Sequence, residues 1–134
     1  MLLFIKRSCL SACCIPIICF ASCTRDNEEM FLPSAEIIIY APLANAAIRT
    51  GDTIYIDGLA TSETGLHGYE LAIRKPGEPN LYFQHFHDHT DSLLINDKWK
   101  NIVTQAGDLE LMISVILDHD DRRKNLTIPL QVRN

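Results

Sequence analysis

The chain has no cysteine beyond residue 23. Its five cysteines lie in the N-terminal segment, at Cys9, Cys13, Cys14, Cys19 and Cys23. Small secreted domains without a large core are held by disulfides, and cysteine-rich zinc domains need thiolate ligands. Both classes are therefore excluded for residues 24–134, so a fold in that range must be held by its hydrophobic core.

The chain also lacks an excess of positive charge. Its 12 Lys and Arg residues are outnumbered by 17 Asp and Glu, which gives a formal net charge of −5. Binding to a nucleic-acid backbone requires a basic patch, so we expect no nucleic-acid partner. With 134 residues, the chain has room for one small domain and a short appendage.

Motifs of common enzyme chemistry are missing as well. Residues 24–134 contain no Gly-x-Ser-x-Gly nucleophile motif, no glycine-rich phosphate-binding loop and no thiol. The sequence also positions no convincing acid/base pair. We therefore predict that the protein is not an enzyme.

The longest apolar run is too short to span a membrane. It covers residues 9–21, about 13 residues, whereas a membrane-spanning helix needs roughly 20. Lys6 and Arg7 precede it and small residues end it, which is typical of a secretory signal peptide. We expect residues 1–22 to be such a peptide. A short membrane anchor helix is the alternative.

The residues that end this run resemble a bacterial lipobox. They read Phe20-Ala21-Ser22-Cys23, although Phe20 departs from the more common leucine. The resemblance implies a lipoprotein signal peptide, cleaved just before Cys23, and lipidation of the Cys23 thiol. Each buried methylene of the attached acyl chains contributes about 0.8 kcal/mol of membrane anchoring. A plain secreted protein is the alternative.

Residues 24–29 are polar and acidic and show no apolar period. We therefore expect residues 23–32 to hold the lipidated cysteine and a flexible tether. An acidic stretch after the lipidated cysteine also resembles the export signal of Bacteroidetes-type lipoproteins. The expected location is therefore the outer membrane, with the domain in the periplasm or on the cell surface.

From residue 33 the sequence alternates between apolar and polar residues in short runs separated by turn signals. The turn Lys75-Pro76-Gly77-Glu78-Pro79 is the strongest of these signals. Residues 97–105 lack the two-residue period and are predicted to form a helical turn, with Trp99 and Ile102 packed inward. Pro129 suggests that the last strand lies at a sheet edge. The predicted strands are 35–40, 53–59, 66–73, 81–89, 92–95, 109–118 and 126–132.

Seven short strands in about 100 residues are typical of a β-sandwich. We predict an all-β fold over residues 33–134: a single Ig-like or fibronectin-III-like antiparallel sandwich. The segments 51–58 and 65–73, followed by the histidine-rich strand, resemble small Bacteroidetes-type lipoproteins with an uncharacterised Ig-like domain. The resemblance implies the fold and the cell-envelope location, but no activity.

The candidates for chemistry are five histidines: His67, His85, His87, His89 and His119. On the predicted strand 81–89, His85, His87 and His89 share one face. Neighbouring histidines in this row are about 6.5–7 Å apart along the strand. His67 begins the inward row of one strand and His119 ends the inward row of another. These two strands are antiparallel neighbours in an Ig-like sandwich, so we expect His67, His87, His89 and His119 to meet at one end.

Neutral imidazoles are common ligands of zinc and copper ions. We predict a lipid-anchored binding module that holds a divalent transition metal through His67, His87, His89 and His119, with His85 as a further ligand. Candidate outer partners of these ligands are the carboxylates Asp88, Asp118 and Asp120.

Alternatives remain open at this point. The histidines are also compatible with an ordinary solvated face, or with a pH-sensitive or partner-binding cluster. The rival function is a metal-free interaction or accessory module that binds a protein or glycan.

Overall fold

The structure, a computed structural model, describes residues 33–134, and every regular element in this range is a β-strand. The predicted signal peptide, the lipidation of Cys23 and the tether over 23–32 lie outside the described residues. Among residues 33–134 there is no helix of a length and apolarity that would cross a membrane. The strands are β1 (Glu36–Ala41), β2 (Ala46–Ile48), β3 (Thr53–Leu66), β4 (Gly68–Arg74), β5 (Asn80–Phe86), β6 (Thr90–Lys100), β7 (Gly107–Ile116) and β8 (Arg123–Val132).

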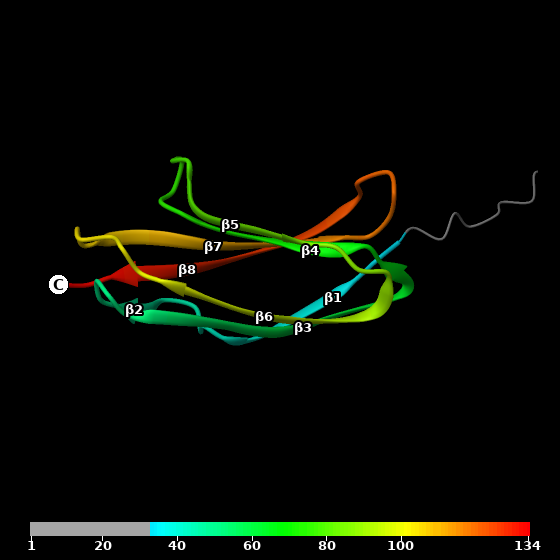
Figure 1. Cartoon of the computed structure of the whole chain (residues 1–134), viewed down its shortest axis with the longest axis horizontal. Helices are drawn as coiled ribbons and strands as arrows, with labels where there is room; N and C mark the ends of the chain where they lie inside the picture. Colours follow the sequence, from blue (N-terminus) through cyan, green and yellow to red (C-terminus); the bar gives the residue numbers. More distant parts are fainter. Residues whose placement is uncertain (1–32) are drawn as a thin grey trace, which may run out of the picture. The chain divides into compact units, whose positions relative to one another are not determined.

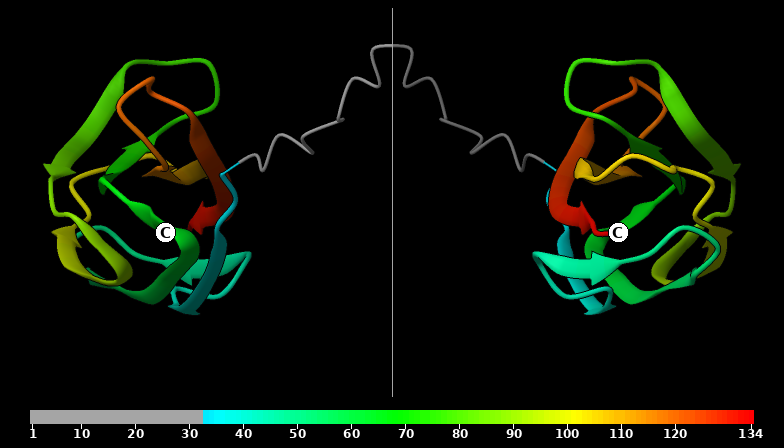
Figure 2. Two further views of the ribbon diagram at one scale, coloured as in Figure 1. Left: turned by 90° about the vertical axis from the view of Figure 1, so that its right-hand side faces the viewer. Right: turned by 90° about the vertical axis from the view of Figure 1, so that its left-hand side faces the viewer.

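The strands form two sheets that face each other (Figures 1 and 2). One sheet has the order β1-β3-β6 and the other β2-β8-β7-β4-β5. All pairs are antiparallel except β2 with β8, which is parallel. The predicted Ig-like or fibronectin-III-like sandwich is therefore confirmed. The strand missed by the sequence reading is β2, which has only three residues.

The core lies between the two sheets and follows from period-two alternation. In β7 every second residue is buried, from Leu109 to Val115, and in β3 the inward row includes Ile54 and Ile56. Burying one such aliphatic side chain stabilises the fold by about 1.5–3 kcal/mol. The buried residues all belong to one compact unit, Phe31–Asn134, which therefore contains the complete described core and is expected to fold alone.

The helical turn predicted over residues 97–105 is wrong. Residues 97–100 continue β6 and pair with β3, with Trp99 opposite Ile54. The two-residue period was obscured because a carboxylate, Asp97, occupies an inward position; it accepts a 2.6 Å hydrogen bond from the Tyr82 hydroxyl. Trp99 is buried as expected, but Ile102 is exposed.

The last strand is not at an edge, contrary to the expectation from Pro129. The short β2 pairs with residues 130–132, immediately after the proline. The backbone N–H of Asn45 also donates a 2.7 Å hydrogen bond to the carbonyl of Pro129. A proline is tolerated here because the neighbouring strand does not extend as far as its missing N–H.

Candidate functional site

Three connections between strands carry histidines to one end of the sandwich. His67 lies between β3 and β4, and its backbone N–H donates to the carbonyl of Ile116 at 2.8 Å. His87 and His89 lie between β5 and β6, and His119 lies between β7 and β8. Because β4 is flanked by β5 and β7 in its sheet, these connections meet at the same end, which faces the viewer in the left view of Figure 2.

Four imidazole rings are in contact at this end. The ring centres of His67 and His119 are 4.2 Å apart, and those of His67 and His89 are 4.5 Å apart. His87 lies 4.7 Å from His89, and His89 lies 5.8 Å from His119. We call these four residues the histidine cluster. His89 is its central member, because it contacts all three of the other rings.

His85, His87 and His89 do not share the face of one strand, as the sequence reading expected. β5 ends at Phe86, so His87 and His89 lie in a loop. The rings of His85 and His87 are nearly parallel, 11° apart, as strand spacing requires, but those of His87 and His89 are perpendicular, at 88°. The chain turns here because β6 begins at Thr90 in the opposite sheet.

Gly68 permits the approach that brings His87 to the cluster. It has φ of +124°, and a Cβ built on it would lie 2.1 Å from the carbonyl oxygen of Phe86 and 2.9 Å from the Cα of His87. Only glycine has no side chain to fill that space. The end of β5 can therefore lie directly against the start of β4, next to His67.

The ring of His67 is partly buried. Within the described residues its Nδ1 is buried and has no hydrogen-bond partner. Burial lowers the pKa of His67 below its ordinary value of 6.5, and repulsion from His119 and then His89 lowers it further, against the opposing charge of Asp118. The neutral ring therefore predominates at neutral pH, with a lone pair available for a ligand.

The loop that carries His119 is fixed by Asp118. Its Oδ1 accepts hydrogen bonds from the backbone N–H groups of Asp120, at 2.9 Å, and Arg122, at 3.2 Å. Its Oδ2 is buried without a hydrogen bond, yet the Nε of Arg122 lies only 2.5 Å away as an ion pair. Burial alone would raise the pKa of Asp118, but the contacts with Arg122 lower it overall. Asp118 therefore orders the loop.

The other two predicted outer carboxylates also act on their own loops. Asp120 lies 3.7 Å from the Nη2 of Arg122, and its side chain is largely exposed. Asp88 Oδ1 accepts a 2.7 Å hydrogen bond from the backbone N–H of His89. Among the described residues, no hydrogen bond joins Asp88, Asp118 or Asp120 to a ring of the cluster.

A polar network that the sequence reading missed lies beside the cluster. Glu70 accepts a hydrogen bond from the Nη1 of Arg123 through Oε2, and its Oε1 lies 3.2 Å from the Nδ1 of His85. The hydrogen bond from Arg123, followed by that from His85, lowers the pKa of Glu70 although burial opposes this. Arg123 also pairs with Asp121 at 2.7 Å. No motif joins these residues, because strand pairing alone brings Glu70 opposite His85.

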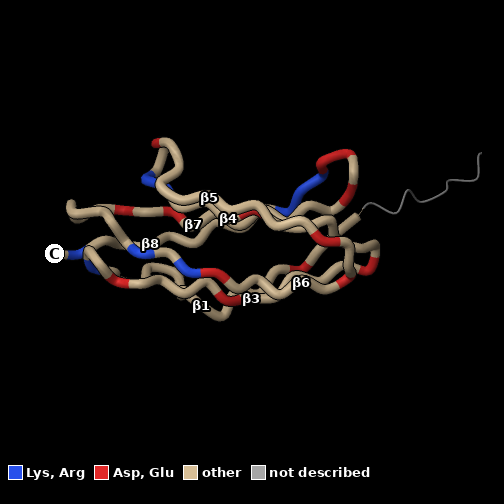
Figure 3. Tube along the Cα trace, viewed as in Figure 1, with Lys and Arg blue, Asp and Glu red and all other residues tan. Residues whose placement is uncertain are grey.

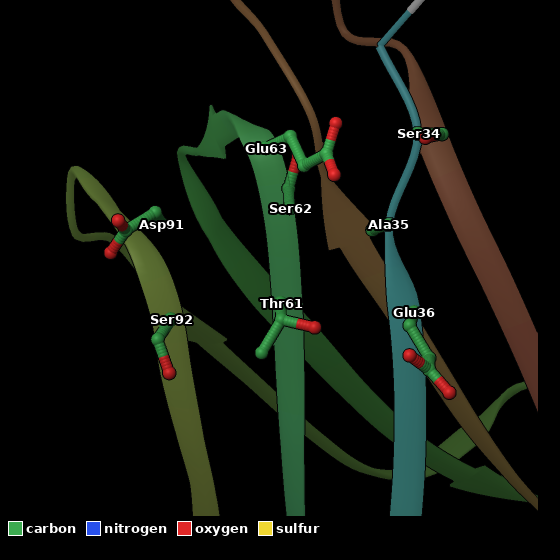
Figure 4. Close-up of a pocket in the computed structure, with 8 residues that line it drawn as sticks. All are labelled: Ser34, Ala35, Glu36, Thr61, Ser62, Glu63, Asp91 and Ser92. Atoms are coloured by element: carbon green, nitrogen blue, oxygen red, sulfur yellow. The ribbon is translucent and has the colours of Figure 1, made fainter.

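A second feature, away from the histidines, is an open polar pocket of about 630 Å³ on the β1-β3-β6 sheet (Figure 4). Hydroxyl and carboxylate groups line it, and the Ser62 hydroxyl is already bonded to Thr64 at 3.1 Å. None of the predicted site residues lines this pocket. Its lining residues are Ser34, Ala35, Glu36, Thr61, Ser62, Glu63, Asp91 and Ser92.

As the side chains stand, no group of three or more His, Cys, Asp or Glu residues within 33–134 is arranged around a common metal position. The rings of the cluster pack edge to face instead of pointing their nitrogens at one point. The arrangement is nevertheless chemically capable of ligation, because it gathers four imidazole rings, one of which has a buried nitrogen without a partner.

Neither a protein-family model nor a curated protein matches the sequence. Among solved structures, the chain is similar to fibronectin(III)-like modules of CbhA from Clostridium thermocellum, with 19% identity and a TM-score of 0.47, covering 72% of this chain and 94% of that one. It is also similar to the CARDB domain of a Pyrococcus furiosus protein, with 11% identity and a TM-score of 0.48, covering 75% and 94%. A Niemann-Pick type C2 protein from the Japanese carpenter ant has 13% identity and a TM-score of 0.49, covering 75% and 91%.

Proposed function

We propose that the protein is a binding module for a divalent transition metal, which the histidine cluster holds. The single observation that carries the proposal is the convergence of four imidazoles from three separate loops, with a buried, unpartnered nitrogen at His67. A buried nitrogen without a hydrogen bond is unfavourable by about 1–3 kcal/mol. A metal ion would satisfy it.

The ring spacing supports a single shared ion. Zinc–nitrogen bonds are about 2.0–2.1 Å long, so two imidazoles on one tetrahedral ion have ring centres about 5 Å apart. The neighbouring rings of the cluster lie between 4.2 and 5.8 Å apart, on both sides of that value. Ligation therefore requires rotation of the side chains but no large movement of the strands.

The donor set favours a borderline transition metal over calcium or magnesium. Imidazole nitrogens suit zinc, copper and nickel, whereas the hard cations take oxygen ligands. The carboxylates nearest to the cluster are engaged by their own loops, Asp118 with Arg122 and Asp88 with the backbone of His89. Residues 24–134 offer no thiolate. Zinc and divalent copper are thus the proposed ions.

The proposed location is the outer membrane, where lipid on Cys23 would anchor the domain. This part of the proposal rests on the lipobox-like residues 20–23 alone. Metabolic labelling with an alkyne-bearing fatty acid in a bacterial host tests it. Label should be incorporated by the wild-type chain and lost in Cys23→Ala. Equal labelling of both chains would contradict lipidation at this residue.

The test of metal binding is calorimetric titration of an untagged protein spanning residues 31–134 with Zn²⁺ and Cu²⁺. This length contains the whole described core and leaves out all five cysteines, whose thiols would bind the same ions. We expect one ion per chain with a dissociation constant of about 1 µM or tighter, equivalent to about 8 kcal/mol.

Two variants accompany the titration. His87→Ala combined with His119→Ala removes ligands from two different loops and should abolish the tight, stoichiometric binding. The matched control is Asn80→Ala, which removes an exposed polar side chain at the far end of β5, outside the cluster, and should leave the affinity unchanged. Weak binding of several ions, or tight binding that survives the double substitution, would overturn the metal proposal.

A second candidate function is glycan binding by the outer face of the β1-β3-β6 sheet. Tyr40 and Tyr55 are 56% and 65% exposed on this face, next to the exposed apolar side chains of Ile38 and Leu94. Tyrosine presents an apolar ring together with a polar hydroxyl, which suits the surface of a sugar. Binding on a glycan array that is lost in Tyr40→Ala with Tyr55→Ala would support it; an array without binding would reject it.

A further inference from the structure

We propose that His85 is a capture ligand, which binds the ion first and passes it along His87 to the histidine cluster. The inference rests on the proposed metal site and concerns how that site is loaded. His85 lies outside the cluster, and its ring is next to that of His87. Its side chain is 47% exposed. It therefore meets solvent ions before the partly buried His67 does.

Glu70 presets the ring of His85 for ligation. An ionised carboxylate only accepts hydrogen bonds, so the contact with Glu70 Oε1 at 3.2 Å places the proton on Nδ1 of His85. The lone pair then resides on Nε2, on the far side of the ring. A carboxylate behind a histidine, oriented in this way, is the usual arrangement at metal ligands. Glu70 is itself held by Arg123, so the ring is fixed from behind.

Four of the rings form a continuous series from His85, at the end of β5, to the partly buried His67. The steps between ring centres are 6.5 Å from His85 to His87, 4.7 Å from His87 to His89 and 4.5 Å from His89 to His67. An ion held at His85 is thus presented to the next ligand at a high effective concentration, since the transfer is intramolecular. An ion that reaches the partly buried His67 directly has no such advantage.

The surroundings of this end favour the approach of a cation. Acidic residues predominate near the β3–β4 and β5–β6 connections at this end, with Glu63, Asp88 and Asp91, whereas acidic and basic residues lie next to each other between β7 and β8 (Figure 3). Arg122 and Arg123 are both neutralised by carboxylate partners. A cleft with an excess of one charge raises the local concentration of the opposite ion and its rate of association. The carboxylates are Glu63, Asp88, Asp91, Asp118, Asp120 and Asp121.

The test is to mix Co²⁺ with the protein spanning residues 31–134 in a stopped-flow instrument. The visible absorption of the bound ion reports the rate of binding. Co²⁺ serves as a spectroscopic substitute for Zn²⁺. In His85→Ala, we expect the association rate of Co²⁺ to fall about tenfold. This is the lower end of the rate increase that a raised local concentration of ions gives. Release should slow by the same factor, because a residue that acts only on the path leaves the dissociation constant unchanged. Glu70→Gln should give a smaller slowing in both directions.

Asn80→Ala, at the other end of β5, is the matched control and should change neither rate. An unchanged association rate in His85→Ala would overturn the proposal. A weaker affinity with an unchanged association rate would instead make His85 an ordinary ligand of the final site. If the wild-type protein binds no ion in stoichiometric amount, the metal proposal itself fails, and this outcome is visible in the equilibrium titration before any rate is measured.

Discussion

The two ends of the sandwich are built on opposite principles. One end, which we call the closed end, is formed by residues 49–52 and 101–103. There a fully buried asparagine forms hydrogen bonds with backbone groups of both segments. Asn101 donates to the carbonyl of Arg49 at 3.0 Å and accepts from the N–H of Val103 at 2.9 Å. The other, the histidine end, gathers four imidazoles and leaves the Nδ1 of His67 without a partner within the described residues.

This difference separates a structural use of polar groups from the ligand-binding use that we propose. At the closed end every named polar group has a partner, and Thr50 adds a further 2.6 Å bond to the carbonyl of Val103. Buried groups satisfied in this way stabilise the fold and leave nothing for a ligand. At the histidine end the same sandwich tolerates an unsatisfied group, which is what a site awaiting its ligand requires. The predictions below alter one end at a time.

The largest effect is expected from Gly68→Ala at the histidine end. Left-handed φ costs an alanine about 1–2 kcal/mol, and overpacking against the backbone of Phe86 adds about 1–3 kcal/mol. We expect a loss of about 4 kcal/mol in the free energy of unfolding, measured in urea, together with loss of metal binding as His87 moves away. Gly65→Ala is the control: its φ is +90° but its Cβ would meet open space. It should lose only about 1 kcal/mol. Equal losses in the two variants would contradict the close approach at Gly68.

At the closed end, Asn101→Ala should be the most harmful substitution. It leaves the N–H of Val103 buried without a partner, at about 1–3 kcal/mol, and it also removes the bond to the carbonyl of Arg49 and the packing of a fully buried side chain. We expect a loss of about 3 kcal/mol in urea denaturation, with metal affinity unchanged in the folded fraction. Thr50→Val, which removes one bond from the same network, should lose about 1 kcal/mol. A metal affinity that fell with Asn101→Ala would show that the two ends are not independent.

The sequence predicted the sandwich because its core strands alternate cleanly. Residues Leu109 to Val115 have the two-residue period in full, so their strand could be placed to within two residues. The errors fell where tertiary contacts override the pattern. Asp97 faces inward because the Tyr82 hydroxyl satisfies it, and burial together with that bond raises the pKa of Tyr82 to about 12. The short β2 has no alternation to detect.

The grouping of His67, His87, His89 and His119 could be anticipated from topology, since strands β5, β4 and β7 are neighbours. The predicted placement of His87 and His89 on one strand face was wrong. β5 ends at Phe86, so these two residues reach the cluster through a turn. The network of Glu70 with His85 and Arg123 had no signal in the sequence. It depends on strand register, which one residue of slip would destroy.

Zinc should stabilise the protein only through the histidine end. A ligand that binds the folded state alone adds about 2.7 kcal/mol when its concentration is 100 times the dissociation constant. We expect a corresponding rise in the midpoint of thermal unfolding for the wild type and for Thr50→Val. The rise should vanish in the double variant His87→Ala, His119→Ala. A rise that persists in this variant would place the stabilising ion elsewhere.

The smallest effect is the pH dependence of the metal-free protein, and its sign follows from His67. The pKa of His67 is lowered in the fold from its ordinary 6.5, mainly by burial, so below that pH the unfolded chain takes up a proton more readily than the folded one. The midpoint of thermal unfolding should therefore fall as the pH decreases from 7.5 to 5.5. Glu70 and Asp118 also have lowered pKa values, but their effects begin near their ordinary values of 4.5 and 3.8, below this window.

His67→Phe isolates this contribution. It removes both the titrating group and the unpartnered nitrogen while keeping a flat ring of similar shape. The variant should be about as stable as the wild type at pH 7.5, because no satisfied hydrogen bond is lost. Its unfolding midpoint should also fall less on acidification than that of the wild type. A His67→Phe protein that is strongly destabilised at pH 7.5 would mean that the ring nitrogen has a partner in solution, and the contrast between a satisfied end and an unsatisfied one would be lost.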